Sequence, residues 1–380
     1  MTRAIVLGAG MVGSLMARDL AADPAYEVTS ADVRPEALAR FTPADRVRTL
    51  LADLGDPAAI GRAVAGFDIV MGALSSSLGL QTLRAVLEAG KTYCDISFMA
   101  EDPASLDGLA RERGVTAVVD CGVCPGASNV AIGRAIAELD VTHDVEILVG
   151  GLPVVRRWPY EYKAPFAPHD VIEEYTRPAR IVEQGRVVVR EALSEPELVE
   201  FDGVGTLEAF NTDGLRSLIR SFPGVPHMRE RTLRYPGHIA LMRVLRETGY
   251  FSKDEIVVGS SRVRPLDVTA ALLFPKWSFE EGEQDLTVCR VIVTGEKNGR
   301  RTRYIWELHD VYDAGTKTRS MSRCTGFPAT IMARMLAEKR FVKPGVHAPE
   351  ACGAEPGVLE TMLGELGKRG VTYRARIEQD

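Results

Sequence analysis

The residues Ala4-Ile5-Val6-Leu7-Gly8-Ala9-Gly10-Met11-Val12-Gly13 open a stretch, ending at Asp32, that decides the fold of this chain. The apolar run from Ile5 to Leu7 is typical of a buried parallel strand. Three glycines follow in the G-x-G-x-x-G spacing, and apolar residues then recur at helical intervals as Val12, Met16 and Leu20. This order of strand, glycine turn and helix predicts a βαβ unit that binds a dinucleotide.

Each part of this motif has a physical role. Gly8 allows a tight turn, Gly10 lets the backbone approach a pyrophosphate, and Gly13 lets the helix pack on the strand. The helix N-terminus then faces the anion. Asp32 follows about 20 residues later, where an acid accepts a hydrogen bond from a ribose 2′-OH. A glycine triplet alone is a common turn, but strand, helix and acid in register favour the dinucleotide site.

The cofactor is expected to be NAD, with NADP less favoured. The carboxylate of Asp32 accepts a hydrogen bond from a 2′-OH but repels a 2′-phosphate. Arg34, two residues later, weakens that preference.

Composition narrows the class of protein. The chain has 380 residues, room for two domains, and its 46% hydrophobic and 26% charged residues are typical of a globular protein. A formal charge of −6 without a basic block argues against nucleic acid or an anionic membrane as a partner. No apolar run has the length of a membrane span, no signal peptide is expected before the first strand, and six irregularly spaced cysteines suggest reduced thiols. We therefore expect a cytoplasmic protein.

The first 120 residues predict an α/β domain with a Rossmann doubly wound parallel sheet. Six strand-like runs alternate there with helical segments, and Asp56-Pro57 is a helix-start signal. The expected strands lie near 5–7, 27–32, 47–51, 67–71, 93–96 and 115–119.

The pattern changes after Asp120. A loop leads into a helix over 130–139, and strand-like runs separated by long loops follow. These runs are 145–149, 179–189, 288–294 and 302–309, and the residues 296–300 are expected to join the last two as a hairpin. They predict a second, α+β domain with a mixed, largely antiparallel sheet. A helix over 328–337 and the segment 344–349 suggest that the chain then returns to the first domain. We expect a dinucleotide domain at 1–124, completed by 326–380, and a second domain at 125–325.

Several short motifs resemble the saccharopine dehydrogenase superfamily, and within it most closely the bacterial L-lysine 6-dehydrogenases. Besides the glycine turn they are 120–126 (DCGVCPG), 149–153 (VGGLP), Glu161-Tyr162, Tyr175-Thr176-x-Pro178, 207–212 (LEAFNT), 221–223 (SFP) and 232–238 (TLRYPGH). Their order and spacing together make the resemblance specific.

The resemblance implies a homodimer, built by the substrate domain, and NAD-dependent oxidation of an amine. For the lysine enzymes the reaction is oxidative deamination of the side-chain amine of L-lysine, or of a related amine, to a semialdehyde that cyclises, with release of ammonia. The segments 73–77 and 93–98 depart from the lysine enzymes, and Tyr162-Lys163 looks more like the Tyr-Lys pair of saccharopine reductases. A saccharopine- or carboxynorspermidine-type reductase acting on a secondary amine or imine is therefore an alternative. A non-catalytic nucleotide-binding regulatory protein is a third interpretation.

The reaction requires a neutral amine, since an ordinary lysine amine has a pKa of about 10.4. The site must therefore lower that pKa or supply a base. Ligands of open α/β sheets lie beyond the carboxyl ends of the strands, which nominates 74–77, 95–98 and 120–125. Asp95 is a candidate partner or base for the amine, and a structural turn aspartate is the alternative. The expected cofactor contacts are Gly8, Gly10, Met11, Val12, Gly13, Asp32, Val33, Arg34, Ala73, Leu74, Ser75, Asp120, Gly122 and Pro125.

The second domain supplies the other candidates. Arg234 is the first choice for a substrate carboxylate because its guanidinium forms a planar bidentate fork. Lys163 is the second choice, or a general acid or base, and His238 titrates in the range for proton transfer, although a lone histidine is more often structural. The remaining candidate contacts to a small-molecule amine or amino acid are Tyr162, Asn211, Thr212, Arg231 and Tyr235.

No metal site is expected. Cys121 and Cys124 form a Cys-x-x-Cys pair, but zinc needs four ligands and no second pair stands at a useful distance. Both cysteines are interpreted as small residues lining the loop.

Overall fold

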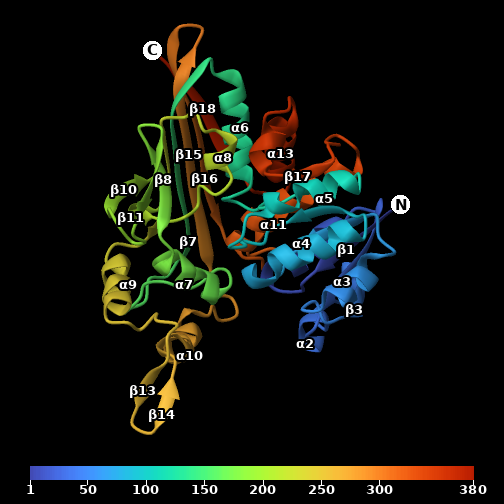
Figure 1. The fold of residues 1–380 in the computed structure, drawn as a ribbon, viewed down its shortest axis with the longest axis horizontal. Helices are drawn as coiled ribbons and strands as arrows, with labels where there is room; N and C mark the ends of the chain where they lie inside the picture. The colour runs from blue at the N-terminus through green and yellow to red at the C-terminus, as the bar shows by residue number, and fades with distance from the viewer. The chain divides into compact units, whose positions relative to one another are not determined.

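The computed structural model describes residues 1–380, which form two compact units. The first unit combines Met1–Ala137 with Ser322–Thr372, and the second combines Glu138–Met321 with Tyr373–Asp380. Each unit is built around its own large sheet (Figure 1).

A seven-stranded parallel sheet forms the centre of the first unit, in the order β17-β6-β5-β4-β1-β2-β3. The Rossmann sheet predicted from the sequence is therefore confirmed. The strand order changes direction between β1 and β4, the point at which such sheets bind ligands. The strands are β1 (Thr2–Leu7), β2 (Tyr26–Asp32), β3 (Val47–Leu51), β4 (Ile69–Gly72), β5 (Thr92–Asp95), β6 (Thr116–Val118) and β17 (Gly345–His347).

Helices and short 3-10 turns connect these strands, and their apolar sides form the core with Ile5, Leu7, Val70 and Leu83. The helix start predicted at Asp56-Pro57 is present, since Asp56 accepts hydrogen bonds from the amides of Ala58 and Ala59. The helices are α1 (Met11–Ala21), α2 (Pro35–Leu38), α3 (Pro57–Val64), α4 (Gly79–Glu88), α5 (Asp107–Glu112), α6 (Ala127–Glu138), α11 (Ser320–Ala337), α12 (Pro349–Gly353) and α13 (Val358–Lys368), with 3-10 turns at Pro43–Asp45, Ser76–Leu78 and Pro103–Leu106.

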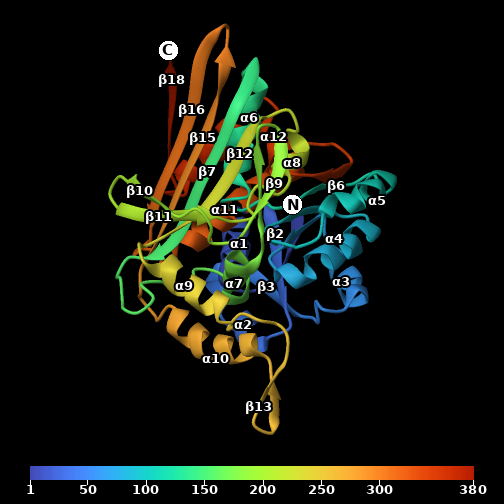
Figure 2. The same cartoon turned by 60° about the vertical axis from the view of Figure 1, so that its left-hand side comes forward.

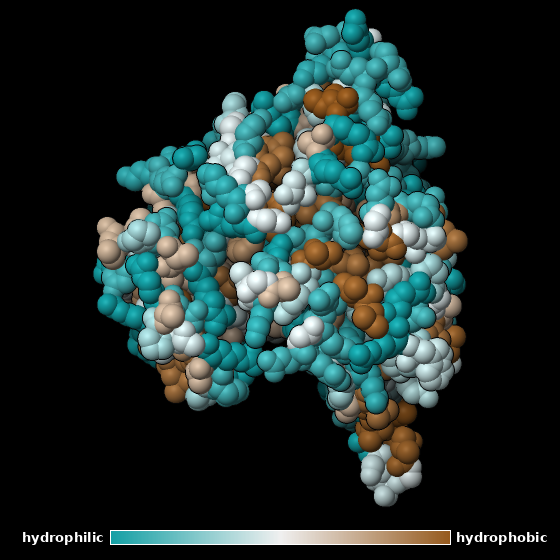
Figure 3. All heavy atoms as spheres, turned by 180° about the vertical axis from the view of Figure 1, so that it is seen from behind, coloured by the Kyte–Doolittle hydropathy of each residue, from teal (hydrophilic) through white to brown (hydrophobic).

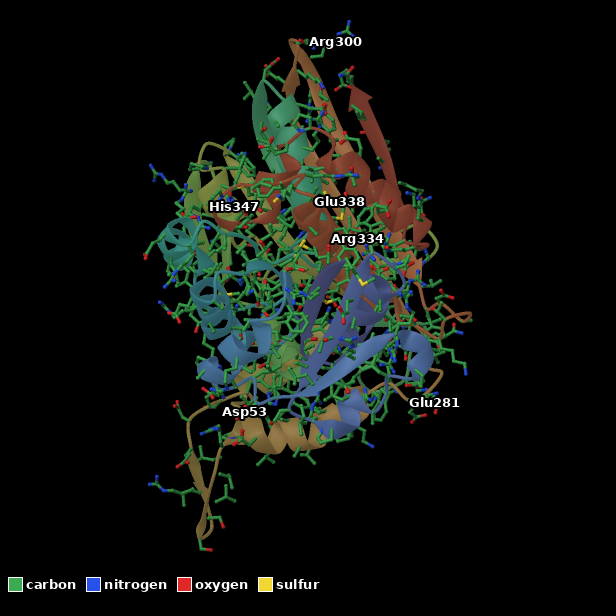
Figure 4. All side chains as sticks on the ribbon, turned by 90° about the vertical axis from the view of Figure 1, so that its right-hand side faces the viewer. Asp53, Glu281, Arg300, Arg334, Glu338 and His347 are labelled. Atoms are coloured by element: carbon green, nitrogen blue, oxygen red, sulfur yellow. The ribbon has the colours of Figure 1, made fainter.

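The C-terminal segment completes the first unit. Figure 4 marks it by Arg334 on α11, Glu338 just beyond that helix and His347 on β17. β17 adds the seventh strand beside β6. The first unit extends to Ala137, beyond the expected boundary at 124, because α6 packs closely on α12: a Cβ at Gly133 would meet the Glu350 carbonyl oxygen at 2.1 Å.

A nine-stranded mixed sheet forms the second unit. Figure 2 shows β7, β12, β15 and β16 side by side; β7 and β12 are parallel, and β15 and β16 are antiparallel. The strands are β7 (Val141–Pro153), β8 (Ala179–Glu183), β9 (Arg186–Arg190), β10 (Glu197–Phe201), β11 (Gly205–Asn211), β12 (His227–Arg234), β15 (Asp285–Lys297), β16 (Arg300–Val311) and β18 (Tyr373–Gln379). The unit also holds the helices α7 (Pro168–Thr176), α8 (Leu218–Ser221), α9 (His238–Glu247) and α10 (Pro265–Trp277).

Three features of this unit differ from the sequence expectation. The run 179–189 is a hairpin of two strands, because Gln184 and Gly185 take positive φ and turn the chain. β18 lies beside β16, so the last eight residues belong to the second unit. A separate hairpin, β13 (Ile256–Val258) with β14 (Ser261–Val263), lies between α9 and α10 in the chain. It projects from the second unit and carries exposed apolar side chains (Figure 3).

Candidate functional site

The glycine turn after β1 has the shape that a bound pyrophosphate requires. Gly8 has φ +106, and a Cβ there would meet the Ala73 carbonyl oxygen at 2.5 Å. A Cβ at Gly13 would meet the Gly8 carbonyl oxygen at 2.1 Å, so the start of α1 lies directly on the turn. Around Gly10, by contrast, no heavy atom lies within 4 Å of a Cβ position, and no side chain caps α1. The open backbone at Gly10 and the uncapped helix N-terminus fit a dinucleotide phosphate.

Asp32 lies at the end of β2, against this turn. Its Oδ2 accepts a hydrogen bond from the Ala9 amide at 2.8 Å, and its Oδ1 accepts from the Arg34 amide at 2.9 Å and from Arg34 Nε at 3.2 Å. Burial raises the pKa of Asp32, but the hydrogen bonds from Arg34 and Ala9 outweigh it and hold the pKa below its usual value. The carboxylate is therefore charged and fixed, while the Arg34 side chain remains 56% exposed.

The segment after β4 lies at the carboxyl edge of the sheet. Ala73, Leu74 and Ser75 follow β4, and the Ala73 amide donates to the Leu7 carbonyl at 2.9 Å. Ser75 Oγ lies 3.1 Å from Ser77 Oγ. The chain after β4 thus borders the glycine turn, as the strand-end rule predicts.

Asp95, at the end of β5, is completely buried. Its Oδ1 accepts from the Asp120 amide at 3.1 Å and its Oδ2 from the Tyr93 hydroxyl at 3.2 Å. Burial, and next the charge of Asp120, raise the pKa of Asp95 to about 8. A catalytic base must reach its substrate, and the buried carboxyl group of Asp95 contacts only the protein in this structure. Its burial therefore argues against the role of base.

The segment Asp120–Gly126 forms a tight turn, in which the Gly122 amide donates to the Pro125 carbonyl at 3.0 Å. Cys121 is buried and Cys124 partly exposed, and all six cysteines are free thiols. In residues 1–380 no group of three or more His, Cys, Asp or Glu side chains is arranged to hold a metal ion.

In the second unit, Arg234, Tyr162 and His238 lie in one buried cluster with Tyr175 and Glu174. The Arg234 guanidinium donates to Glu174 Oε2 at 2.5 Å and to the Tyr175 hydroxyl at 3.1 Å. It also lies 4.5 Å above the ring of Tyr162, within the range of a cation–π contact. A substrate carboxylate at Arg234 would have to compete with Glu174 in this cluster.

The contacts of His238 define its protonation. Its Nδ1 lies 2.8 Å from the Tyr160 carbonyl, which only accepts, so Nδ1 carries the proton. Its Nε2, 2.9 Å from the Tyr175 hydroxyl, then accepts from that hydroxyl. Burial, and next the charge of Arg234, lower the pKa of His238 to about 3. Both ring nitrogens are occupied, and the imidazole is neutral at physiological pH.

The other predicted substrate residues are placed elsewhere in the unit. Each makes contacts within the protein: Lys163 with Glu283 and the Ser278 carbonyl, Arg231 with Glu146 and Glu197, Asn211 with Ser194 and Glu195, Thr212 with Glu230 and Thr232, and Tyr235 with the Pro153 carbonyl. Of the catalytic and substrate candidates in this unit, Tyr162, Arg234 and His238 lie in one cluster, and Asn211 and Arg231 are paired across β11 and β12.

Sequence reasoning missed several buried or partly buried ionisable residues. Glu174 and Tyr175 complete the Arg234 cluster, and the motif Tyr175-Thr176-x-Pro178 was the only signal for them. Glu230 is 3% exposed, and burial raises its pKa to about 8 despite the hydrogen bond from Thr212. Arg229 and Arg231 flank Glu230 in β12 and point to the opposite face of the sheet. Because the sequence of this segment is charged on both faces, it did not indicate that Glu230 is buried.

Comparison with known proteins identifies the family. Residues 4–118 match the model of the saccharopine dehydrogenase NADP binding domain, and residues 122–371 match that of the saccharopine dehydrogenase C-terminal domain. The chain belongs to the saccharopine dehydrogenase family. None of its helices combines the length and apolar character that a membrane span requires.

Characterised relatives match along most of the chain. A carboxyaminopropylagmatine dehydrogenase from Synechocystis is 25% identical, with 97% of this chain and 96% of the relative aligned. A saccharopine dehydrogenase [NADP(+), L-glutamate-forming] from Schizosaccharomyces pombe is 21% identical over 87% and 88% of the two chains. A carboxynorspermidine synthase from Vibrio cholerae is 24% identical over 78% and 75%.

The fold has a counterpart among solved structures. The saccharopine dehydrogenase (L-Glu forming) of Saccharomyces cerevisiae matches with a TM-score of 0.82 at 16% identity, with both chains fully covered. Together with the sequence relatives, these findings make the chain an oxidoreductase of the saccharopine dehydrogenase family that acts on amine or imine substrates with a nicotinamide nucleotide.

Proposed function

We propose that this member of the saccharopine dehydrogenase family forms or splits a secondary amine that carries an amino-acid portion. The observation that carries the proposal is the alignment, over 78–97% of this chain, with three relatives named for carboxyaminopropylagmatine, saccharopine and carboxynorspermidine. The pair Tyr162-Lys163, similar to that of saccharopine reductases, also favours it.

The second candidate is oxidative deamination of the side-chain amine of L-lysine or a related amine. The family resemblance of the motifs at 120–126 and 232–238 to the lysine 6-dehydrogenases favours this activity. The two reactions differ in their products. Oxidation of a secondary amine gives an aldehyde and a primary amine, whereas deamination of lysine gives a semialdehyde and free ammonia.

The nicotinamide, when bound, supplies the hydride acceptor or donor. Gly8, Gly10, Gly13 and the start of α1 would bind the pyrophosphate, and Asp32 would accept from the adenosine ribose. We propose NAD as the preferred cofactor, because the charged Asp32 repels a 2′-phosphate. The chain would then orient the amine and remove its proton, with Lys163 as the proposed acid or base.

Lys163 is the better of the two second-unit candidates for proton transfer. Its side chain is 12% exposed and its ammonium group donates to Glu283, so it carries a proton that it could give to the nitrogen of the departing amine. His238 has both nitrogens occupied and a pKa lowered to about 3, which favours a structural role.

A substrate screen tests the proposal. The purified chain is supplied with NAD or NADP and with saccharopine, other carboxyalkyl secondary amines, L-lysine, ornithine or agmatine, and NAD(P)H formation is followed together with ammonia. NAD(P)H formed from a secondary amine without ammonia is the expected result. Ammonia released in equal amount to NADH from L-lysine would establish the second candidate, and no turnover of any amine, in either direction, would overturn both.

A further inference from the structure

Asp95 ties the end of β5 to the segment that follows β6. Its Oδ1 accepts the Asp120 amide at 3.1 Å, and its backbone carbonyl accepts the Cys121 amide at 2.7 Å. The side chain has no exposed surface. All the contacts of the carboxyl group are therefore made within the first unit, and none can be made to a substrate without rearrangement.

The residue held by Asp95 has an unusual backbone. Asp120 takes φ +58, the left-handed region that residues other than glycine adopt rarely. The tight turn Gly122–Gly126 follows directly: a Cβ at Gly126 would meet the Gly122 carbonyl oxygen at 1.8 Å. A hydrogen bond to the amide of Asp120 therefore fixes the point from which this turn starts.

The far end of the turn is fixed as well. Asn129 Oδ1 accepts the Gly126 amide at 3.3 Å, and Asn129 Nδ2 donates to Glu350 at 3.0 Å. Asn129 is completely buried and Glu350 is nearly so. The turn is thus anchored at both ends by buried polar side chains.

Tyr93 and Gly72 place the Asp95 carboxyl group. The Tyr93 hydroxyl donates to Asp95 Oδ2 at 3.2 Å. It passes so close to β4 that a Cβ at Gly72 would lie 2.1 Å from it and 2.8 Å from Asp95 Cβ. Only glycine at position 72 leaves room for this contact.

We propose that Asp95 is a positioning residue rather than the catalytic base: through the Asp120 amide it holds the 120–126 turn in place at the carboxyl edge of the sheet. The inference rests on the proposed function, since it takes Asp120, Gly122 and Pro125 to border the nicotinamide nucleotide. Burial raises the pKa of Asp95, which agrees with a carboxyl group that remains neutral while it holds the backbone.

Two substitutions at Asp95 separate the roles. Asp95→Asn keeps an acceptor oxygen for the Asp120 amide, and its NH2 group can donate to the Tyr93 hydroxyl oxygen. Asp95→Ala leaves a buried amide and a buried hydroxyl without this partner. We expect Asp95→Asn to bind NADH, by fluorescence titration, within threefold of the wild type and to keep kcat/KM within tenfold. Asp95→Ala should weaken NADH binding at least tenfold and lower kcat/KM at least 100-fold.

Asp107, the first residue of α5, provides a matched control because it binds a strand of the same sheet. Its Oδ1 accepts the Val346 amide at 2.9 Å, so it also holds a backbone segment, but at the amino end of β17. Asp107→Ala should lower the Tm while NADH binding stays within twofold of the wild type. A second test uses the backbone itself: Asp120→Gly, which accepts positive φ, should bind NADH better than Asp120→Ala.

The outcomes distinguish this inference from the proposed function. Equal losses in Asp95→Asn and Asp95→Ala would show that the carboxylate itself is required and would overturn the inference. So would unchanged NADH binding in Asp95→Ala. If the Asn and Ala variants differ in NADH binding as expected but no amine is turned over, the proposed substrate class fails and the positioning role stands. A wild type that binds neither NADH nor NADPH overturns both.

Discussion

Asp32 and Arg34 act in opposite directions on the proposed preference for NAD. The carboxylate of Asp32 would repel a 2′-phosphate, yet Arg34 Nε donates to it at 3.2 Å and offsets part of its charge. With its side chain 56% exposed, Arg34 is free to turn toward a phosphate at the adenosine end. The sequence predicted both residues, but only the structure shows that they are paired.

We expect Arg34→Ala to sharpen the preference for NAD. Loss of the guanidinium removes the one cation next to Asp32, so the KM for NADP should rise about tenfold, a loss of about 1.4 kcal/mol, while the KM for NAD changes less than threefold. Steady-state kinetics with both cofactors measure this. Arg48→Ala, an arginine paired with Glu27 across β2 and β3, is the control and should change neither KM. Equal changes for the two cofactors would contradict the prediction.

We expect Glu230 to make the stability of the second unit depend on pH. Burial raises its pKa to about 8 in the folded state, so the folded chain binds this proton more tightly than the unfolded chain. The stabilisation is present below the ordinary glutamate pKa of about 4.3 and is lost as the pH rises through 8.

The variant Glu230→Gln mimics the protonated group at every pH. Its free energy of unfolding, from urea titrations at pH 5 and pH 8, should fall less across that range than the wild type does, by at least about 1.4 kcal/mol, the value of one pKa unit. Glu200→Gln, an exposed glutamate on β10, should behave as the wild type. If the free energy of unfolding changed by the same amount from pH 5 to pH 8 in the wild type, in Glu230→Gln and in Glu200→Gln, the role given to Glu230 would be contradicted.

At the scale of elements, the first unit could be read from sequence because its strands and helices alternate with local signals. β3 occupies the residues predicted for it, α3 begins at the predicted Asp56-Pro57, and the G-x-G-x-x-G turn lies between β1 and α1. The strands β10, β11 and β12 were not predicted, since β10 and β12 carry charged residues on both faces and show no alternation of apolar and polar residues. The partner of Arg234, Glu174, lies 60 positions away and depends on tertiary packing that no local pattern encodes.

The junction of α1 with the returning helices is a second long-range feature. Asp19 on α1 accepts from Thr330 and Arg334 of α11, both at 2.6 Å, and from Arg369 after α13 at 2.7 Å. Its side chain is only 10% exposed. Burial raises the pKa of Asp19, but the arginines outweigh it and lower the pKa, so this stabilisation is present at neutral pH and lost as the pH falls through the lowered value.

Removing this carboxylate should loosen the C-terminal segment. Asp19→Ala leaves Arg334 and Arg369 without their buried partner, and the cost of breaking such a buried pair is about 3–5 kcal/mol. Chemical denaturation at pH 7 measures the loss. Asp45→Ala, which breaks the more exposed contact with Arg18, should cost about 1 kcal/mol or less. If the two variants were equally stable, Asp19 would not anchor the segment.

At the scale of the whole molecule, one segment of the second unit leaves an unusual set of apolar side chains exposed. Helix α10 is apolar on two sides: Ala270, Leu273 and Trp277 are buried, whereas Val268 and Leu272 are 46% and 65% exposed. The β13–β14 hairpin next to it exposes three consecutive large apolar residues, and a two-stranded hairpin has little stability of its own (Figure 3). The exposed set is Leu241, Val244, Tyr250, Ile256, Val257, Val258, Val268 and Leu272.

Such a surface is expected to be covered in solution, and we propose that a second copy of this chain covers it. The eight side chains expose an area on the order of 800 Å², about what each partner contributes to a standard interface. We therefore predict that the full chain is a dimer by light scattering and that Leu272→Glu shifts it to monomer, because a charge at the centre of an apolar contact is costly to bury. Leu198→Glu, equally exposed at 63% but on β10, should remain dimeric. A monomeric wild type, or a Leu272→Glu variant that stays dimeric, would show that this segment serves another purpose.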